Sequence, residues 1–298
     1  MKWTIFMPVL NEAAIIESKI LHSLDIGRVV VVEGSIPQTR DVGSNGLSSD
    51  GTSEILKSYS DKIIYLPVGM KRNRAEYQND ALLYIHKNMA DTEILHRTDA
   101  DEFIDLQAID TIEQHFYEIN DWMIYTDLIN FSSATTATNN VAPLGSVGFP
   151  FCRDKYLTAG MYHERFYRYR PDLLYKQSAH CLSDSMGRPL FAHPDYYFNR
   201  SILGTEICSP IFHYKYIDGF ERLIKAEMSY LEEDEKMPRG APPTFDMAMK
   251  RLRNILGSAS HIIPWEEHCS RVRESKWFVY EPAKYNLDLT YEEFMSMI

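Results

Sequence analysis

Cysteine is scarce in this sequence, and its spacing excludes two common kinds of site. The 298 residues include four cysteines, and none of them forms a Cys-x-x-Cys pair. They are Cys152, Cys181, Cys208 and Cys269. Neither a zinc ribbon nor a disulfide framework is therefore indicated. The pattern suits a reducing compartment, and we expect the protein in the cytoplasm.

Excess positive charge and long apolar runs are also lacking. The chain has 31 Lys and Arg residues against 42 Asp and Glu residues, a formal net charge of −11. Affinity for a nucleic-acid backbone comes mostly from Lys and Arg, so we do not expect nucleic acid as a partner. The N-terminus is only briefly apolar before Asn11 and Glu12, and no apolar run approaches about 20 residues. We expect a soluble protein with at most peripheral membrane contact.

Strand and helix patterns alternate over the first hundred residues. The predicted strands cover residues 4–7, 28–32, 63–66 and 94–95. The predicted helices follow Asn11, begin near Thr52 and run from about Ala75 to Met89. We expect Pro8 to end the first strand and Asn11 to cap the first helix. This alternation predicts an α/β fold, a Rossmann-like, doubly wound and mainly parallel sheet.

An acidic motif, Asp99-Ala100-Asp101-Glu102-Phe103, follows the fourth predicted strand. In extended backbone, side chains two residues apart point to the same side, so Asp99 and Asp101 can converge on one cation. Such a pair with Mg²⁺ or Mn²⁺ can neutralise a leaving diphosphate. The loops at 8–12 and 33–35 are expected at the same sheet edge, where ligands bind in such folds. The alternative is an acidic loop without a metal.

The later part of the chain gives weaker signals. The polar tract at 132–140 predicts a surface loop. Alternating basic and aromatic residues at 165–170 predict an edge or cleft strand. Helical spacing after residue 220 and a Thr290-x-x-Glu293 capping box predict a mostly helical C-terminal extension. The length fits about two domains, which we place at 1–217 and 218–298.

Several segments in this order resemble the GT-A fold glycosyltransferases, most closely glycosyltransferase family 2. They are Met7–Glu12, Val31–Ser35 with Ser49–Thr52, Asn79-x-Ala81, Asp99–Phe103 and His213–Tyr216. Family 2 usually has adjacent aspartates at the second segment. This chain has Val32 and Glu33 there, followed by an insertion from Ile36 to Leu47.

The resemblance implies a nucleoside diphosphate sugar as donor, Mn²⁺ or Mg²⁺, and a glycan or other hydroxyl as acceptor. It places Pro8, Glu12 and Asn79 near the nucleotide, Glu33 near its base and ribose, Asp99 near the ribose or metal, and Asp101 and His213 on the metal. An imidazole beside a carboxylate suits Mn²⁺ better than Ca²⁺. The alternatives are a core histidine for His213, a first-turn helix carboxylate for Glu12 and a solvated strand end for Glu33.

An inverting transferase also needs a carboxylate that takes the acceptor's proton. The candidates are Glu164, Asp184 and Asp195, and the resemblance favours Glu164; its alternative is an ion pair with a neighbouring arginine. Arg72 and Arg74 are candidates for the diphosphate, or for a solvated helix face.

The sequence, together with the resemblance, therefore predicts a metal-dependent glycosyltransferase domain at 1–217. The resemblance implies a role in polysaccharide or glycoconjugate synthesis. A nucleotidyltransferase is the second hypothesis, although the loop at 8–12 contains none of the glycines that such an enzyme normally has there. A GT-A-like domain without turnover, which binds a glycan or a partner, is the third.

Overall fold

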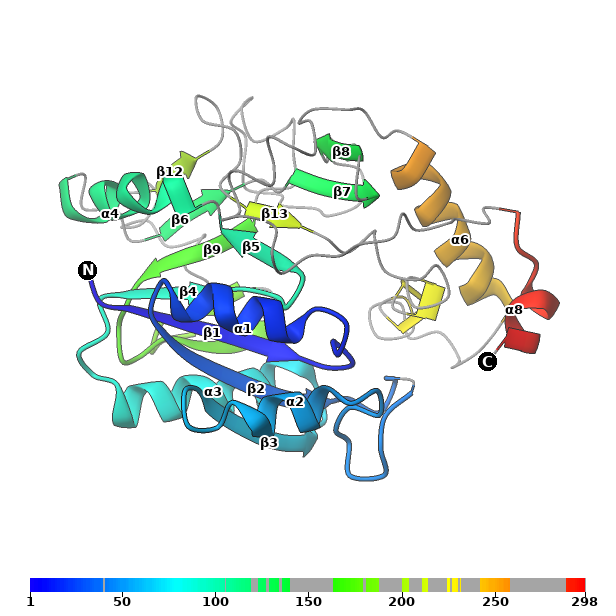
Figure 1. Cartoon of the computed structure of the whole chain (residues 1–298), viewed down its shortest axis with the longest axis horizontal. Coiled ribbons are helices and arrows are strands. Elements are labelled where there is room, and N and C mark those ends of the chain that lie inside the picture. The colour runs from blue at the N-terminus through cyan, green and yellow to red at the C-terminus, as the bar shows by residue number, and fades with distance from the viewer. Residues whose placement is uncertain are drawn as a thin grey trace. The chain divides into compact units, whose positions relative to one another are not determined.

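The computed structural model of the chain describes residues 1–39, 41–104, 106–118, 123–126, 129–133, 136–139, 163–178, 181–187, 200–203, 211–213, 224–225, 227–229, 231, 242–257 and 288–297. The chain divides into two compact units. Unit 1 comprises residues 1–37, 41–127 and 162–211, and unit 2 comprises 38–40, 128–161 and 212–298. We describe each unit by itself (Figure 1).

Unit 1 is built on a seven-stranded sheet with the order β12-β6-β9-β4-β1-β2-β3. Its strands are β1 (Trp3–Val9), β2 (Arg28–Ser35), β3 (Ile64–Met70), β4 (Ile94–Arg97), β6 (Met123–Thr126), β9 (His163–Arg168) and β12 (Arg200–Leu203). Strands β3, β2, β1 and β4 are parallel, and β9 is antiparallel to both β4 and β6. This confirms the predicted α/β class with a mainly parallel sheet, which is consistent with a Rossmann-like GT-A fold.

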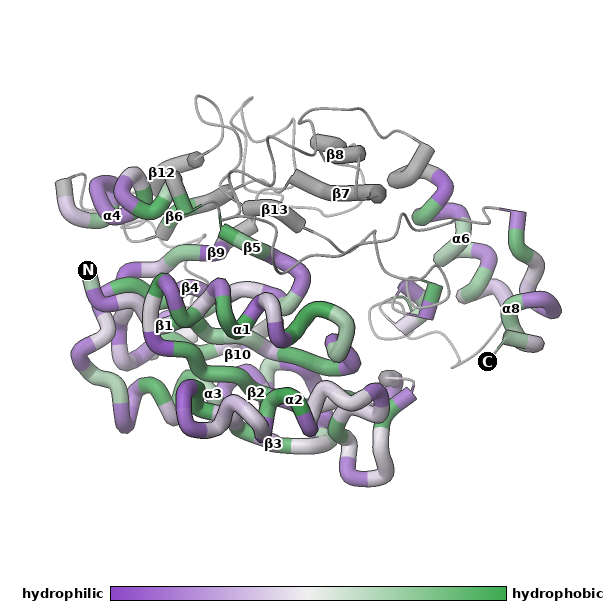
Figure 2. Tube along the Cα trace, in the orientation of Figure 1, coloured by the Kyte–Doolittle hydropathy of each residue, from purple (hydrophilic) through white to green (hydrophobic). Residues whose placement is uncertain are grey.

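Helices cover both faces of this sheet, because the first two crossovers (β1 to β2 and β2 to β3) run one way along it and the third (β3 to β4) runs back. The helices of unit 1 are α1 (Ile16–Leu24), α2 (Thr52–Ser58), α3 (Arg74–Asn88) and α4 (Ile109–Glu118). Right-handed crossovers put α1 and α2 on one face and α3 on the other. On the α3 face, Leu82 and Ile85 pack against Phe6, Val30 and Val32. The intervening strand residues are also buried, and Figure 2 shows β1 and β2 as largely hydrophobic segments.

Two local predictions at the end of β1 are wrong. The strand continues through Pro8 to Val9, because β4 pairs with β1 only as far as Phe6 and Pro8 has a single neighbouring strand. A missing N–H is tolerated at such an edge position. Asn11 does not cap α1, whose N-cap is Ile15 without a side-chain hydrogen bond. Asn11 instead adopts the left-handed conformation, with φ of 56°.

The basic and aromatic segment at 165–170 is not an edge strand. It forms β9 inside the sheet, where Phe166 and Tyr167 are fully buried on opposite faces. The polar tract at 132–140 is also not simply a loop. Strands β7 (Ile129–Ser133) and β8 (Thr136–Asn139) form an antiparallel hairpin there. Unit 1 further contains β5 (Glu102–Ile104), a 3₁₀ turn at Leu106–Ala108, and the antiparallel pair β10 (Leu174–Ser178) and β11 (Cys181–Ser183).

The described parts of unit 2 after residue 223 are helical, as predicted. Residues 224–225, 227–229 and 231 are helical, and α6 (Pro242–Gly257) contacts α8 (Tyr291–Met297). Phe245 and Phe294 meet in their core with ring centroids 5.4 Å apart. The predicted capping box is confirmed, because Glu293 N donates to Thr290 Oγ1 at 3.2 Å and Thr290 N donates to the Glu293 carboxylate at 2.8 Å. Strand β13 (Ile211–His213) runs parallel to β7.

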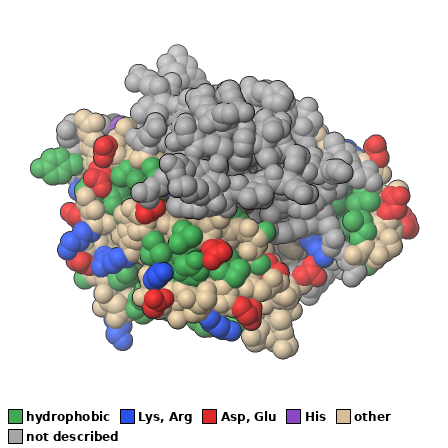
Figure 3. All heavy atoms as spheres, in the orientation of Figure 1, with side chains coloured by type: hydrophobic (Ala, Val, Ile, Leu, Met, Phe, Trp, Pro, Cys, Tyr) green, Lys and Arg blue, Asp and Glu red, His purple; other side chains and the backbone are tan. Residues whose placement is uncertain are grey.

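The expected domain boundary at 217–218 lies outside the described residues, and so does Asp195. No helix in the described ranges is long and apolar enough to cross a membrane. On the described part of the face in Figure 3, acidic and basic side chains lie among apolar ones and no continuous basic area is seen.

Candidate functional site

The candidate site lies at the carboxyl edge of the parallel strands of unit 1, where the chain leaves β1, β2 and β4 at the same edge of the sheet, as predicted. The register of β1 with β2 and β4 brings the ends of these strands together. The loop after β1 is bonded to the segment before α2. Asn11 N donates to Ser48 Oγ at 2.9 Å, and Glu12 N donates to Thr52 Oγ1 at 2.7 Å. Ala13 N donates to the Asp50 carboxylate at 3.0 Å, so the two loops form one rim.

Asn11 joins this rim to the insertion at 36–47. Its side chain donates to the Asp41 carbonyl at 2.7 Å and accepts from Ser49 N at 2.9 Å. Ser35 Oγ donates to the Gly46 carbonyl at 2.7 Å, which fixes the insertion on the end of β2. The insertion is therefore an integral part of the rim, and the left-handed Asn11 is explained by these two bonds rather than by helix capping.

Glu33 ends the buried valine run of β2 and is itself fully buried. Its Oε1 accepts from Ser48 N at 2.8 Å and from Ser53 Oγ at 2.7 Å, and its Oε2 accepts from the Tyr65 hydroxyl. Burial, together with the bond to Glu33, raises the pKa of Tyr65. Glu33 is thus not a solvated strand end. It holds the rim through three donors of this chain, and its role toward a nucleotide base stays a prediction.

Glu12 lies before α1 rather than in its first turn. Its carbonyl accepts from Ile15 N at 3.0 Å and from Ile16 N at 2.8 Å, and the acidic residue of the first helical turn is Glu17. The alternative interpretation of Glu12 as a first-turn carboxylate is therefore wrong. Its predicted nucleotide contact, like that of Pro8, stays a prediction.

The acidic turn begins as β4 leaves the sheet. Thr98 N donates to the Phe6 carbonyl at 3.0 Å, which extends the pairing with β1 by one bond. Glu102 N then donates to the Asp99 carbonyl at 3.2 Å and closes the turn. Ala100 is 1% exposed, whereas Asp99 and Asp101 on either side of it are half-buried. Two half-buried aspartates therefore flank a residue that is anchored in the core.

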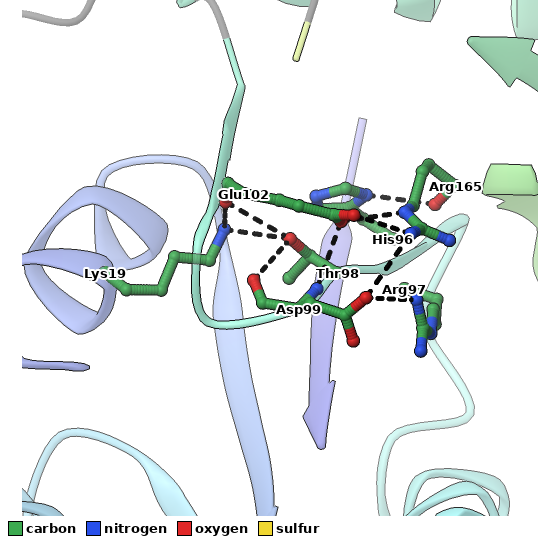
Figure 4. A network of polar contacts seen from close by, with 7 residues as sticks. All are labelled: Lys19, His96, Arg97, Thr98, Asp99, Glu102 and Arg165. Carbon is green, nitrogen blue, oxygen red and sulfur yellow. Dashed lines mark hydrogen bonds and ion pairs between the residues drawn. The ribbon is translucent and has the colours of Figure 1, made fainter. Parts of the chain in front are cut away.

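Arginines approach the turn from β4 and β9 (Figure 4). Arg165 binds Glu102 bidentately, with Nε to Oε2 at 2.7 Å and Nη2 to Oε1 at 2.6 Å. Asp99 Oδ2 contacts Arg97 Nη1 at 2.9 Å and Arg165 Nη2 at 3.4 Å. Although burial lowers the pKa of both guanidinium groups, the nearby carboxylates raise them above the ordinary value.

A lysine reaches the turn from the other side. Lys19 on α1 is 1% exposed, and its Nζ donates to Thr98 Oγ1 at 3.0 Å and to the Glu102 carbonyl. Burial lowers the pKa of Lys19 from 10.5 to about 7, although the charges of Glu102, Asp101 and Asp99 raise it. Figure 4 shows Lys19 and the two arginines on opposite sides of the turn. Three cationic side chains thus surround three carboxylates.

His96 on β4 contributes no charge to this cluster. Burial, followed by the charge of Lys19, lowers its pKa well below the ordinary value. Its Nδ1 lies 2.9 Å from the Arg165 carbonyl, and its ring stacks on Phe166 with centroids 4.6 Å apart. His96 therefore fixes β9 beside β4 and so positions Arg165.

The remaining predicted site residues lie on α3, β9 and β13. Asn79 on α3 holds β10, because its Nδ2 donates to the Tyr175 carbonyl and its Oδ1 accepts from Tyr175 N, both at 2.8 Å. Its role toward a nucleotide stays a prediction. Glu164 lies on β9 opposite Tyr125, and His213 ends β13 in unit 2. The side chains of Glu164 and His213 lie outside the described residues.

Arg72, a candidate for the diphosphate, and Asp184, a candidate base, both have partners nearby in the sequence. Arg72 pairs with Glu76 one turn along the chain, with Nε to Oε1 at 2.6 Å, and its side chain is 88% exposed. This geometry fits the solvated-face alternative. Asp184 is buried in a turn, where its Oδ1 accepts from Met186 N at 2.9 Å.

The donor set at the turn fits a hard cation. Asp99 and Asp101 offer carboxylate oxygens, and Mg²⁺ typically binds one or two carboxylates and completes its shell with water and phosphate oxygens. Within the described ranges, no three His, Cys, Asp or Glu side chains are grouped as metal ligands. A cation here would thus rest on the aspartate pair and on oxygens from a ligand.

The sequence interpretation missed Lys19 and the Arg165–Glu102 pair. Lys19 could have been found, because it interrupts the apolar stripe of Ile16 and Ile20 at helical spacing. The partnership of Arg165 with Glu102 spans 63 positions, and no local pattern indicates such a contact.

Comparison with solved structures finds similar folds at low sequence identity and low TM-score. Crystal structures of S. aureus TarS are among the similar folds. TarS 1–349 in complex with UDP-GlcNAc has a TM-score of 0.42 and 16% identity, over 88% of this chain and 68% of that one. A longer TarS structure has a TM-score of 0.40 and 13% identity, over 86% of this chain and 43% of that one. This chain thus spans less than half of that protein. No family model and no curated protein matches the sequence.

Proposed function

We propose that the chain is a metal-dependent glycosyltransferase that moves a sugar from a nucleoside diphosphate sugar to an acceptor hydroxyl with inversion. One observation carries the proposal. Two half-buried aspartates flank a buried alanine in the turn that leaves β4, at the ligand-binding edge of a parallel sheet. The motif resemblance supports the same assignment. The acceptor is a glycan or another hydroxyl compound.

Asp99 and Asp101 would hold the cation, with His213 as the predicted further ligand. A bound Mn²⁺ or Mg²⁺ supplies positive charge to the departing diphosphate. Asp99 would also meet the ribose, and the rim around Glu12 and Glu33 would border the nucleotide. The two guanidinium groups at Asp99 hold that carboxylate in place before the donor arrives.

Transfer needs a base on the acceptor side. The acceptor oxygen forms a bond to the anomeric carbon while the bond from that carbon to the diphosphate oxygen breaks, and the acceptor proton passes to a carboxylate. We assign this carboxylate to Glu164. It lies on the same strand as Arg165, whose guanidinium contacts the acidic turn.

The first experiment is thermal unfolding with a panel of nucleoside diphosphates, each with and without Mn²⁺. UDP is tested first, because it is the nucleotide named for TarS. At about 100 times the dissociation constant, binding stabilises the native state by about 2.7 kcal/mol. We expect a metal-dependent rise in the unfolding temperature with one base. No rise with any nucleotide would refute the proposal in favour of a domain without turnover.

The matched variants are Asp101→Ala and Asp61→Ala, which alters an exposed carboxylate in the turn after α2. We expect Asp101→Ala to abolish both sugar transfer and the metal-dependent rise, while the unfolding temperature without ligand stays near that of the parent. Asp61→Ala should behave as the parent does. Retained transfer in Asp101→Ala would rule out the metal role. Nucleotidyl transfer to a sugar phosphate in the same assay would favour the second hypothesis.

A further inference from the structure

Within the described ranges, both hydrogen bonds of the Lys19 ammonium go to the segment that carries the aspartate pair. Its Nζ bonds to Thr98 before the pair and to the Glu102 carbonyl after it. It also lies 5.2 Å from the centroid of the Phe103 ring. Lys19 therefore bridges both ends of the turn from α1, as Figure 4 shows, and the two aspartates lie between its two anchor points in the sequence.

Packing alone does not explain a lysine at this position. Its neighbours Ile16 and Ile20 on α1 are fully buried, and Lys19 is 1% exposed. An apolar side chain of similar length fills such a space without the desolvation of an ammonium group, and replacement of buried charges by apolar groups is often neutral or stabilising. What the ammonium adds is the pair of hydrogen bonds to the turn.

We propose that Lys19 is a positioning residue, which sets the 98–102 turn and thereby places Asp99 and Asp101 for the metal and the donor diphosphate. This inference rests on the proposed function. Arg165 fixes the Glu102 carboxylate from β9, whereas Lys19 fixes the backbone of the same residue from α1. With either anchor removed, Glu102 keeps only the other of these two anchors.

The test variant is Lys19→Met, which keeps the length and apolar volume of the side chain but removes the donor. Lys62→Met is the matched control, because Lys62 also lies over an aromatic ring, 5.5 Å from the centroid of Tyr59, on an exposed loop. Lys19→Gln is the second variant, because it retains an N–H donor. Calorimetry measures the affinity for Mn²⁺ with a nucleoside diphosphate, and mass spectrometry follows amide exchange at residues 98–103.

In Lys19→Met we expect a loss of about 10- to 100-fold in that affinity, as for residues that orient metal ligands. The unfolding temperature should stay near that of the parent, and exchange should speed up only at 98–103. Lys19→Gln should recover part of the affinity, and Lys62→Met should match the parent. A merely structural role for Lys19 would leave Lys19→Met with parental affinity, and this result would overturn the proposal.

Failure of the proposed function is distinguishable from failure of this inference. If the parent protein binds no nucleoside diphosphate with Mn²⁺, the proposed function is wrong. Amide exchange then decides the role of Lys19. Faster exchange confined to 98–103 in Lys19→Met supports the turn-positioning role, and unchanged exchange there overturns it. If Lys19→Met does not fold, the same two measurements on Lys19→Gln give the decision.

Discussion

The pair of Arg165 and Glu102 gives the sharpest test of how the acidic turn is held. The Glu102 side chain is 1% exposed and that of Arg165 is 9% exposed, and two hydrogen bonds of 2.6 and 2.7 Å join them. Loss of one member of such a buried pair typically destabilises a protein by about 3 to 5 kcal/mol, because the other charge stays buried. We expect Arg165→Met to fall in this range.

Glu102→Leu should destabilise less than Arg165→Met. After Glu102→Leu, the Arg165 guanidinium still has Asp99 Oδ2 at 3.4 Å as a partner. The double variant should regain most of the loss, since both charges are gone. Its residual loss is about 1 kcal/mol for the bond from Asp99 N to Glu102 Oε2 at 3.1 Å. The coupling energy of the double-mutant cycle should therefore amount to several kcal/mol.

The assay is urea denaturation, with the transition of unit 1 followed separately because the chain has two units. Arg28→Met is the control. Arg28 pairs with Asp91 at 2.7 Å, but these side chains are 39% and 53% exposed, so about 0 to 1 kcal/mol is expected. A loss below about 1 kcal/mol in Arg165→Met, or a double variant that loses the sum of the single ones, would refute the reasoning.

Two further predictions concern Lys19 and Asn79. Burial lowers the pKa of Lys19 from 10.5 to about 7, so the unfolded chain binds more protons than the folded chain between these pH values. The free energy of unfolding of the parent should therefore rise with pH across this window, relative to that of Lys19→Met. Parallel urea titrations at pH 7 and pH 9 check this, and no relative change would contradict it. Asn79→Ala should lower the free energy of unfolding by about 1 to 3 kcal/mol and speed amide exchange at Tyr175, because both hydrogen bonds of Asn79 hold β10. Asn88→Ala is the control on the same helix. It removes an exposed bond to the Tyr84 carbonyl and should change little.

The parallel sheet was predictable because its signals are local. Each signal depends on a few adjacent residues. These signals are the Val29–Val32 run, the helical spacing before and after it, and the loops at strand ends. The capping box at Thr290 was predictable for the same reason. The hairpin at 129–139 was not expected, since its polarity resembles a loop, although Thr136 and Thr138 favour extended backbone.

The site was predictable only where its chemistry is written in adjacent residues. Asp99 and Asp101 are two positions apart, so the motif and its place after β4 follow from the sequence. From the adjacent residues alone, Asn11 is interpreted as a helix cap and Glu33 as a carboxylate that faces a cleft. Their actual partners lie in the 41–53 segment and, for Glu33, also at Tyr65. Such contacts depend on the tertiary structure, which no short pattern encodes.

The cations that hold the acidic turn, Lys19 and Arg165, are themselves buried. Asp99 and Asp101 are two positions apart in the turn, so their charged carboxylates repel each other, and an unsupported turn would relieve this repulsion by moving them apart. Arg165 on β9 and Lys19 on α1 both bind the buried Glu102 and so hold the turn in place. The Asp99 side chain stays 38% exposed. A buried ammonium and a buried ion pair thus hold the turn that carries both aspartates. Stability and ligand affinity should therefore respond differently to Lys19→Met, which removes a desolvated charge and an anchor of the turn at once.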